Sequence, residues 1–157
     1  MKLVVAAEVC SWQLMAVVKQ HLIDEGHCLV DLGMQSQDAP MVFYETAPVV
    51  ARYIQEGRAE RGILMCGTGN GVCNIASKFK GVYPGLAESA TAARLHWVIN
   101  RANILCLGAW IVGPRTACDM VDAWLNAEIG EGFDPVIRKR QAEGFARLQQ
   151  IESENMR

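Results

Sequence analysis

The chain has 157 residues, of which 51% are hydrophobic and 20% are charged, and its formal net charge is −2. This length fits one domain over residues 1–157, and the high apolar fraction excludes a disordered chain. The balanced charge excludes a basic surface for nucleic acid or an anionic membrane, and no apolar run approaches the ~20 residues that span a bilayer. We therefore expect a compact cytoplasmic protein with no nucleic-acid or membrane partner.

Short apolar runs alternate with longer amphipathic runs along the sequence. The apolar runs predict buried strands at residues 3–7, 28–32, 62–66, 82–87 and 104–107. The amphipathic runs predict helices at residues 12–25, 48–56, 72–79, 89–101, 114–129 and 135 to about 154. We expect Ser11 to cap the first helix and Gly26 to end it, with Val17, Val18 and Ile23 on its apolar face.

The predicted strands are apolar throughout, which is typical of strands that are buried on both faces. Strand–helix alternation of this kind predicts an α/β fold, with an open, doubly wound, five-stranded parallel sheet between two layers of helices. Ligands of such sheets bind beyond the carboxyl ends of the strands. The residues that follow those ends are Glu8, 66–71, Glu88 and 108–110, so we expect the functional site among them.

The strongest local pattern follows the third predicted strand, where glycines alternate with other residues over residues 66–71, CGTGNG. Glycines between a strand and a helix let the backbone turn sharply and aim several N–H groups at one point, which makes an anion site. The pattern lacks the Gly-Lys-Ser/Thr of a phosphate loop and the spacing of a dinucleotide-binding loop. Tight packing between strand and helix explains the glycines equally well, so the loop alone leaves both interpretations open.

Cys66 favours a chemical role for this loop. A thiol at the end of a strand that faces a helix N-terminus gains thiolate character. Such a thiolate can attack an electrophile, or it can take a proton from a carbon beside a carbonyl while the N–H groups stabilise the enediolate. No histidine has a convincing spacing for a Cys–His hydrolase, so we favour proton abstraction. We expect the other five cysteines to be reduced core residues, and no Cys or His spacing predicts a metal site.

The loop lies within a longer stretch from Gly62 to Lys78, GILMCGTGNGVCNIASK. Together with residues 93–94, 100, 103–105, 107–109 and 121–125, this stretch resembles the ribose-5-phosphate isomerase B and galactose-6-phosphate isomerase family. The likeness extends loosely from Lys2 to about Arg140.

The resemblance implies a Rossmann-like three-layer αβα sandwich and a homodimer or tetramer with active sites at the subunit interface. It also implies aldose–ketose isomerisation through an enediol, without a metal or cofactor. In many members of the family, the cysteine that matches Cys66 moves the proton between C1 and C2, and the threonine that matches Thr68 assists. The loop amides that hold the enediolate in the family match those of Gly67, Gly69, Asn70 and Gly71.

Two catalytic positions differ from the family. Its Asp-His-x-Gly run after the first strand is EVCS at residues 8–11 here, so Glu8 keeps a carboxylate but the histidine is missing. The family's ring-opening histidine aligns with Ile99 in this chain, whereas the asparagine that follows it is present as Asn100. Either His96, one helical turn away, takes over the ring opening, or the substrate needs none. We favour an open-chain tetrose or pentose phosphate, with a tetrose phosphate such as erythrulose 4-phosphate as the natural example.

The phosphate-binding runs of the family differ as well. The family's Gly-Ala-Arg-x-x-Gly run has Trp110 here in place of its arginine. The family's Gly-Gly-Arg-His run aligns with residues 131–134, which read EGFD. Each lost charge-assisted contact is worth about 1.5–3 kcal/mol, so either phosphate binding relies on other cations or the substrate carries no phosphate in the usual place. Arg138 is the candidate, although charges at a helix start are also typical of a solvated face. Trp110 and Phe43 predict either an apolar pocket wall or ordinary core packing.

The sequence therefore predicts an aldose–ketose isomerase for a small sugar or sugar phosphate, in which Cys66 is the base. Glu8 would contact substrate hydroxyls, while Thr68 and Asn100 orient the oxygens. The alternative is a non-catalytic sugar- or sugar-phosphate-binding subunit of a hetero-oligomeric isomerase. The missing histidines and arginine favour this alternative, and the presence of Cys66 and Thr68 opposes it.

The last third of the chain is rich in apolar residues, which include 123–125, Phe133, Phe145 and Leu148. One sheet edge is too small to cover this surface. We therefore expect at least a dimer, in which the C-terminal helix at about 135–154 packs on the partner subunit.

Overall fold

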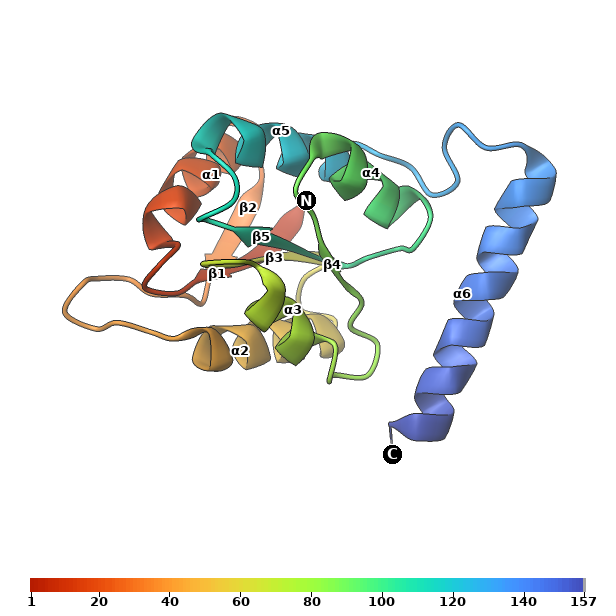
Figure 1. Ribbon diagram of the computed structural model, residues 1–157, viewed down its shortest axis with the longest axis horizontal. Coiled ribbons are helices and arrows are strands. Elements are labelled where there is room, and N and C mark those ends of the chain that lie inside the picture. The colour runs from red at the N-terminus through yellow and green to blue at the C-terminus, as the bar shows by residue number, and fades with distance from the viewer. Residues whose placement is uncertain (157) are drawn as a thin grey trace.

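A parallel sheet lies between two layers of helices in the computed structural model, which describes residues 1–156 (Figure 1). The sheet has the order β2-β1-β3-β5-β4, and its strands are β1 Lys2–Ala7, β2 Cys28–Asp31, β3 Arg61–Cys66, β4 Pro84–Leu86 and β5 Ile104–Gly108. The helices are α1 Trp12–Asp24, α2 Phe43–Gln55, α3 Asn70–Ala76, α4 Ala90–Val98, α5 Pro114–Leu125 and α6 Pro135–Asn155. The predicted α/β class and its five parallel strands are confirmed.

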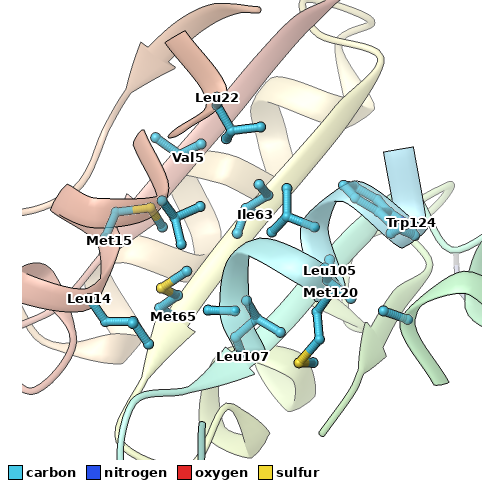
Figure 2. Packing of buried hydrophobic residues seen from close by; sticks show 14 of the residues in the cluster. Val5, Leu14, Met15, Leu22, Ile63, Met65, Leu105, Leu107, Met120 and Trp124 are labelled. Atoms are coloured by element: carbon cyan, nitrogen blue, oxygen red, sulfur yellow. The ribbon is translucent and has the colours of Figure 1, made fainter. Parts of the chain in front are cut away.

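The alternation of side chains along each strand divides the core in two. One set faces α1, α4 and α5 on one side of the sheet (Figure 2), and its strand residues include Leu3, Val5, Ile63, Met65, Leu105 and Leu107. The other set faces α2 and α3, and its strand residues include Val4, Ala6, Leu64, Ile104 and Cys106. Both faces are therefore covered, which explains why the strands are apolar without alternation.

The register of the central strands brings their carboxyl ends together. Ala7 of β1 is paired with Met65 of β3, and Cys66 of β3 is paired with Gly108 of β5. The loops after β1, β3 and β5 therefore leave the sheet at one edge, which we call the carboxyl edge.

Helix α2 begins at Phe43, five residues before the predicted start at Pro48. The carboxylate of Glu45 accepts the N–H of Val42 at 3.0 Å, and this contact stabilises an earlier start at Phe43. Pro48 consequently lies inside the helix, where it cannot donate the usual hydrogen bond to the carbonyl of Tyr44.

The start of α1 also differs from the prediction. Ser11 does not cap the helix through its side chain; its Oγ donates to the carbonyl oxygen of Met65 at 2.8 Å and so ties the β1 loop to β3. Val17 and Ile23, predicted on the buried face, are 44% and 54% exposed. The buried stripe is narrower than expected because α1 contacts the sheet through Leu14, Met15, Val18 and Leu22.

Helix α6 stands apart from the sheet and its layers (Figure 1). None of its 21 residues is buried. Phe145 packs edge-on against Tyr83 with ring centroids 5.2 Å apart, and Glu152 accepts hydrogen bonds from the N–H of Gly81 and the hydroxyl of Tyr83. Over residues 1–156, no helix combines the length and apolar character that a membrane crossing requires.

Candidate active site

The loop between β3 and α3 places a backbone donor against the thiol of Cys66. The N–H of Gly69 donates to Sγ of Cys66 at 3.1 Å, and the N–H of Asn70 donates to Oγ1 of Thr68 at 3.3 Å. Cys66 is 6% exposed, whereas Thr68 is exposed. Because α3 begins directly after these residues, the thiol lies beside the N-terminus of a helix, where unpaired N–H groups can stabilise a developing negative charge.

Close packing explains why this loop needs glycine at three positions. Gly69 has φ +77°, and a Cβ there would lie 2.8 Å from the carbonyl carbon of Leu107. A Cβ on Gly67 would lie 2.8 Å from the indole ring of Trp110, and a Cβ on Gly71 would lie 2.9 Å from the ring of Phe43. The two aromatic side chains therefore lie directly against the loop.

Glu8 lies at the end of β1, beside the strand that carries Cys66. Its side chain is 5% exposed, and its Oε1 accepts the N–H of Cys10 at 3.1 Å. Desolvation, followed by the nearby Glu8 carboxylate, raises the pKa of the Cys10 thiol, and the Cys66 thiol contributes in the same direction. Cys10 therefore belongs to the surroundings of Cys66, although its isolated position in the sequence gave no signal for this.

The expectation that five cysteines are core residues is only partly correct. Cys106 is buried and Cys73 and Cys118 are half-buried, but Cys10 and Cys28 are exposed. A hydrogen bond with Cys106 lowers the pKa of the Cys73 thiol to about 7, whereas burial raises the pKa of Cys106. Like Cys66, both thiols lie on the side of the sheet that α2 and α3 cover.

Two of the predicted substrate-binding residues lie away from this loop. Nε2 of His96 is 2.8 Å from the carbonyl oxygen of Leu86, and its ring packs on Gly85. His96 and Asn100 line a groove of about 610 Å³ between β4 and α6. Within one chain, neither residue joins the loop at Cys66.

Arg138 also lies outside this loop, at the beginning of α6. Its Nε donates to the carbonyl oxygen of Phe133 at 2.8 Å, its stem packs on Gly130, and the residue is exposed. The carboxyl edge of one chain thus brings together Glu8, Phe43, residues 66–71 and Trp110, and it leaves His96, Asn100 and Arg138 elsewhere.

Comparison with known proteins supports an enzymatic role for this arrangement. The model of a family described as Ribose/Galactose Isomerase matches residues 3–140. The chain belongs to the ribose/galactose isomerase family. It is accordingly an aldose–ketose isomerase, and the family predicted from residues 62–78 is confirmed.

Among relatives of this isomerase, a 4-deoxy-4-sulfo-D-erythrose isomerase from Clostridium sp. (strain MSTE9) is 37% identical over 134 residues, which cover 85% of this chain and 84% of the relative. A D-erythrulose-4-phosphate isomerase from Pectobacterium atrosepticum is 29% identical, with 88% and 92% covered.

A similar solved structure is ribose-5-phosphate isomerase B from Clostridium thermocellum, with TM-score 0.88, 29% identity and coverage of 98% of this chain and 99% of that chain. Ribose-5-phosphate isomerase B from Mycoplasma genitalium with bound ribulose-5-phosphate has TM-score 0.86 and 30% identity, with 98% and 97% covered. These structures share the whole fold of this chain.

Proposed function

We propose that this isomerase interconverts the aldose and ketose forms of a four-carbon, open-chain sugar with a terminal anionic group, and that Cys66 is the base. The hydrogen bond from the N–H of Gly69 to Sγ of Cys66, at 3.1 Å, carries the proposal. Because of this hydrogen bond, the N–H groups of one backbone turn can stabilise both the thiolate and an oxyanion that forms beside it.

The reaction needs one base that serves two neighbouring carbons. The Cys66 thiolate takes the proton from the carbon next to the carbonyl, and electrons move onto the carbonyl oxygen to form a cis-enediolate. The N–H groups of residues 67–71 stabilise that charge. The thiol then returns the proton to the former carbonyl carbon, while a proton passes between the two oxygens. Thr68 and Glu8 are the polar side chains placed to contact those oxygens.

A four-carbon substrate explains why a ring-opening histidine is dispensable. A tetrose with a substituent in place of its free 4-hydroxyl has no hydroxyl that can close a five-membered ring. The matching position is Ile99, and His96 is engaged with a backbone carbonyl of β4. The two relatives named above also act, by their names, on four-carbon sugars.

The terminal group is a tetrahedral oxyanion, either a phosphate or a sulfonate. A phosphate monoester carries about 1.5 to 2 negative charges at pH 7, whereas a sulfonate carries a single charge. Trp110 supplies an apolar surface at the position of the family's arginine, which suits the weaker charge better. The apolar surface of Trp110 and the relative named for a sulfo sugar make a sulfonate the second candidate for the terminal group, beside a phosphate.

The cations and polar groups missing from the carboxyl edge are proposed to come from a second subunit. Val136, Leu148 and Ile151 of α6 are 61%, 42% and 45% exposed, which is typical of a helix that packs on a partner. A homodimer or tetramer with α6 across the interface would bring Arg138 of one chain to the site of another. All six cysteines are free, which agrees with a cytoplasmic enzyme.

Proton exchange tests the function directly. The purified enzyme is incubated in deuterated buffer with open-chain C4 sugars that carry a 4-phosphate or a 4-sulfonate, and with C5 and C6 aldose phosphates. We expect deuterium at C1 or C2 of a C4 substrate, with slower exchange for the stably cyclic sugars. Exchange that is fastest with a cyclic pentose or hexose phosphate would contradict the open-chain proposal, and no exchange with any sugar would contradict the enzymatic one.

A further inference from the structure

Trp110 occupies an unusual place beside the reactive thiol. The residue directly follows the end of β5, where Gly108 is the register partner of Cys66. One face of its indole lies so close to Gly67 that a Cβ there would be 2.8 Å from three ring carbons. The ring is therefore in contact with the residue next to Cys66.

The backbone around Trp110 holds the ring in this position. The N–H of Trp110 donates to the carbonyl oxygen of Gly67 at 2.9 Å, and the N–H of Ala109 donates to the carbonyl oxygen of Cys66 at 2.9 Å. The N–H groups of Ile111 and Val112 both donate to Gly108, which closes a tight turn after the tryptophan. These main-chain contacts fix the backbone of Trp110 against the loop that carries Cys66.

The opposite face of the ring is open. Trp110 is 70% exposed, and exposed apolar side chains accompany it at the same edge, with Ile111 at 52%, Val9 at 46% and Phe43 at 39%. An indole that is anchored on one face and free on the other presents a rigid apolar wall to a ligand at Cys66. A sugar chain that extends from the thiol toward Trp110 would contact this wall.

We propose that Trp110 determines the length of the substrate, because its anchored ring occupies space that a longer sugar chain would need. The inference rests on the proposed function and adds the residue that selects four carbons over five. A ring with a single free face also packs against the C–H groups of a short chain, so it favours the small substrate as well as excluding the larger one.

The test compares kcat/KM for C4 and C5 substrates with the same terminal group in the wild-type enzyme and in Trp110→Ala and Trp110→Phe. We expect Trp110→Ala to shift the C5-to-C4 ratio toward C5 by roughly tenfold or more, since filling or emptying a pocket by a few carbon atoms changes discrimination by about 10–200-fold. Trp110→Phe should shift the ratio in the same direction by less.

Phe43→Ala is the matched control. Phe43 packs against Gly71, and Trp110 packs against Gly67 of the same loop. We expect it to slow both substrates while the C5-to-C4 ratio stays at the wild-type value. An unchanged ratio in Trp110→Ala and Trp110→Phe, or an equal shift in Phe43→Ala, would overturn the proposal. If Trp110→Ala loosens the loop and loses all activity, the C5-to-C4 ratio of Trp110→Phe tests the proposal instead. A wild-type enzyme that is inactive on every sugar would instead overturn the proposed function.

Discussion

The carboxyl edge and helix α6 are stabilised in opposite ways. The glycines of the loop at Cys66 are packed against their own chain, with Leu107 beside Gly69 and aromatic rings against Gly67 and Gly71. Helix α6 has 21 residues and none of them is buried. One chain therefore packs the loop at Cys66 by itself, whereas α6 contacts the rest of the chain only in part and leaves Val136, Leu148 and Ile151 exposed.

The sharpest test of the carboxyl edge is Cys66→Ala. We expect isotope exchange to fall by about 10³-fold, within the range of 10²–10⁴ that a general base contributes. Circular dichroism and the melting temperature should change little, because the substitution removes a single sulfur atom. Retention of more than a tenth of wild-type exchange in the folded variant would show that another group is the base.

The same substitution, Gly→Ala, should have opposite effects in the two regions. Gly69→Ala forces a side chain into a position with φ +77° and places its Cβ 2.6 Å from Leu86. A displacement of about 1 Å at a catalytic loop costs about 10²-fold in rate, and we expect a loss of this size in kcat.

Gly144→Ala is the counterpart in α6, where nothing lies within 4 Å of the new Cβ. Because alanine favours a helix interior over glycine by about 0.8–1 kcal/mol, we expect a slightly higher melting temperature and unchanged kcat. A large loss of activity in Gly144→Ala would show that a partner subunit packs closely on that part of the helix.

Removal of α6, from residue 135 onward, tests the dependence on a partner. We expect sedimentation to show a monomer in place of a dimer or tetramer, because the exposed apolar residues of α6 are lost. The melting temperature of the remaining chain should fall by only a few degrees, since both cores lie in the sheet and its layers. An unchanged oligomeric state after the deletion would contradict the proposed interface.

The smallest effect concerns Cys73 in α3, on the side of the sheet that α2 and α3 cover. The hydrogen bond with Cys106 lowers the pKa of the Cys73 thiol from 9.0 to about 7. The stabilisation from this lowered pKa is fully present above pH 9 and is lost as the pH falls through 7.

Alkylation with iodoacetamide, followed by mass spectrometry of the Cys73 peptide, measures this titration. The labelling rate should rise with a midpoint near pH 7. Cys118 is an internal reference, because burial raises the pKa of its thiol. A midpoint for Cys73 at or above that of Cys118 would contradict the interaction with Cys106.

Particular residues show what could and could not be predicted for this chain. The apolar strands and the glycines of residues 66–71 predicted the sheet and the loop, because burial on both faces and a sharp turn each leave a mark in the local sequence. The start of α2 at Phe43 was missed, because it depends on one hydrogen bond between Glu45 and Val42 that no hydrophobic pattern reveals.

The sequence by itself determined the α/β class, the family and the candidate base, since these depend on local composition and on one distinctive stretch. Only the tertiary structure decided which candidates meet. It brings Glu8, Phe43 and Trp110 to the loop at Cys66 and leaves His96, Asn100 and Arg138 near α6. The reason is that the strand order and the direction in which each loop leaves the sheet set distances between residues far apart in the chain.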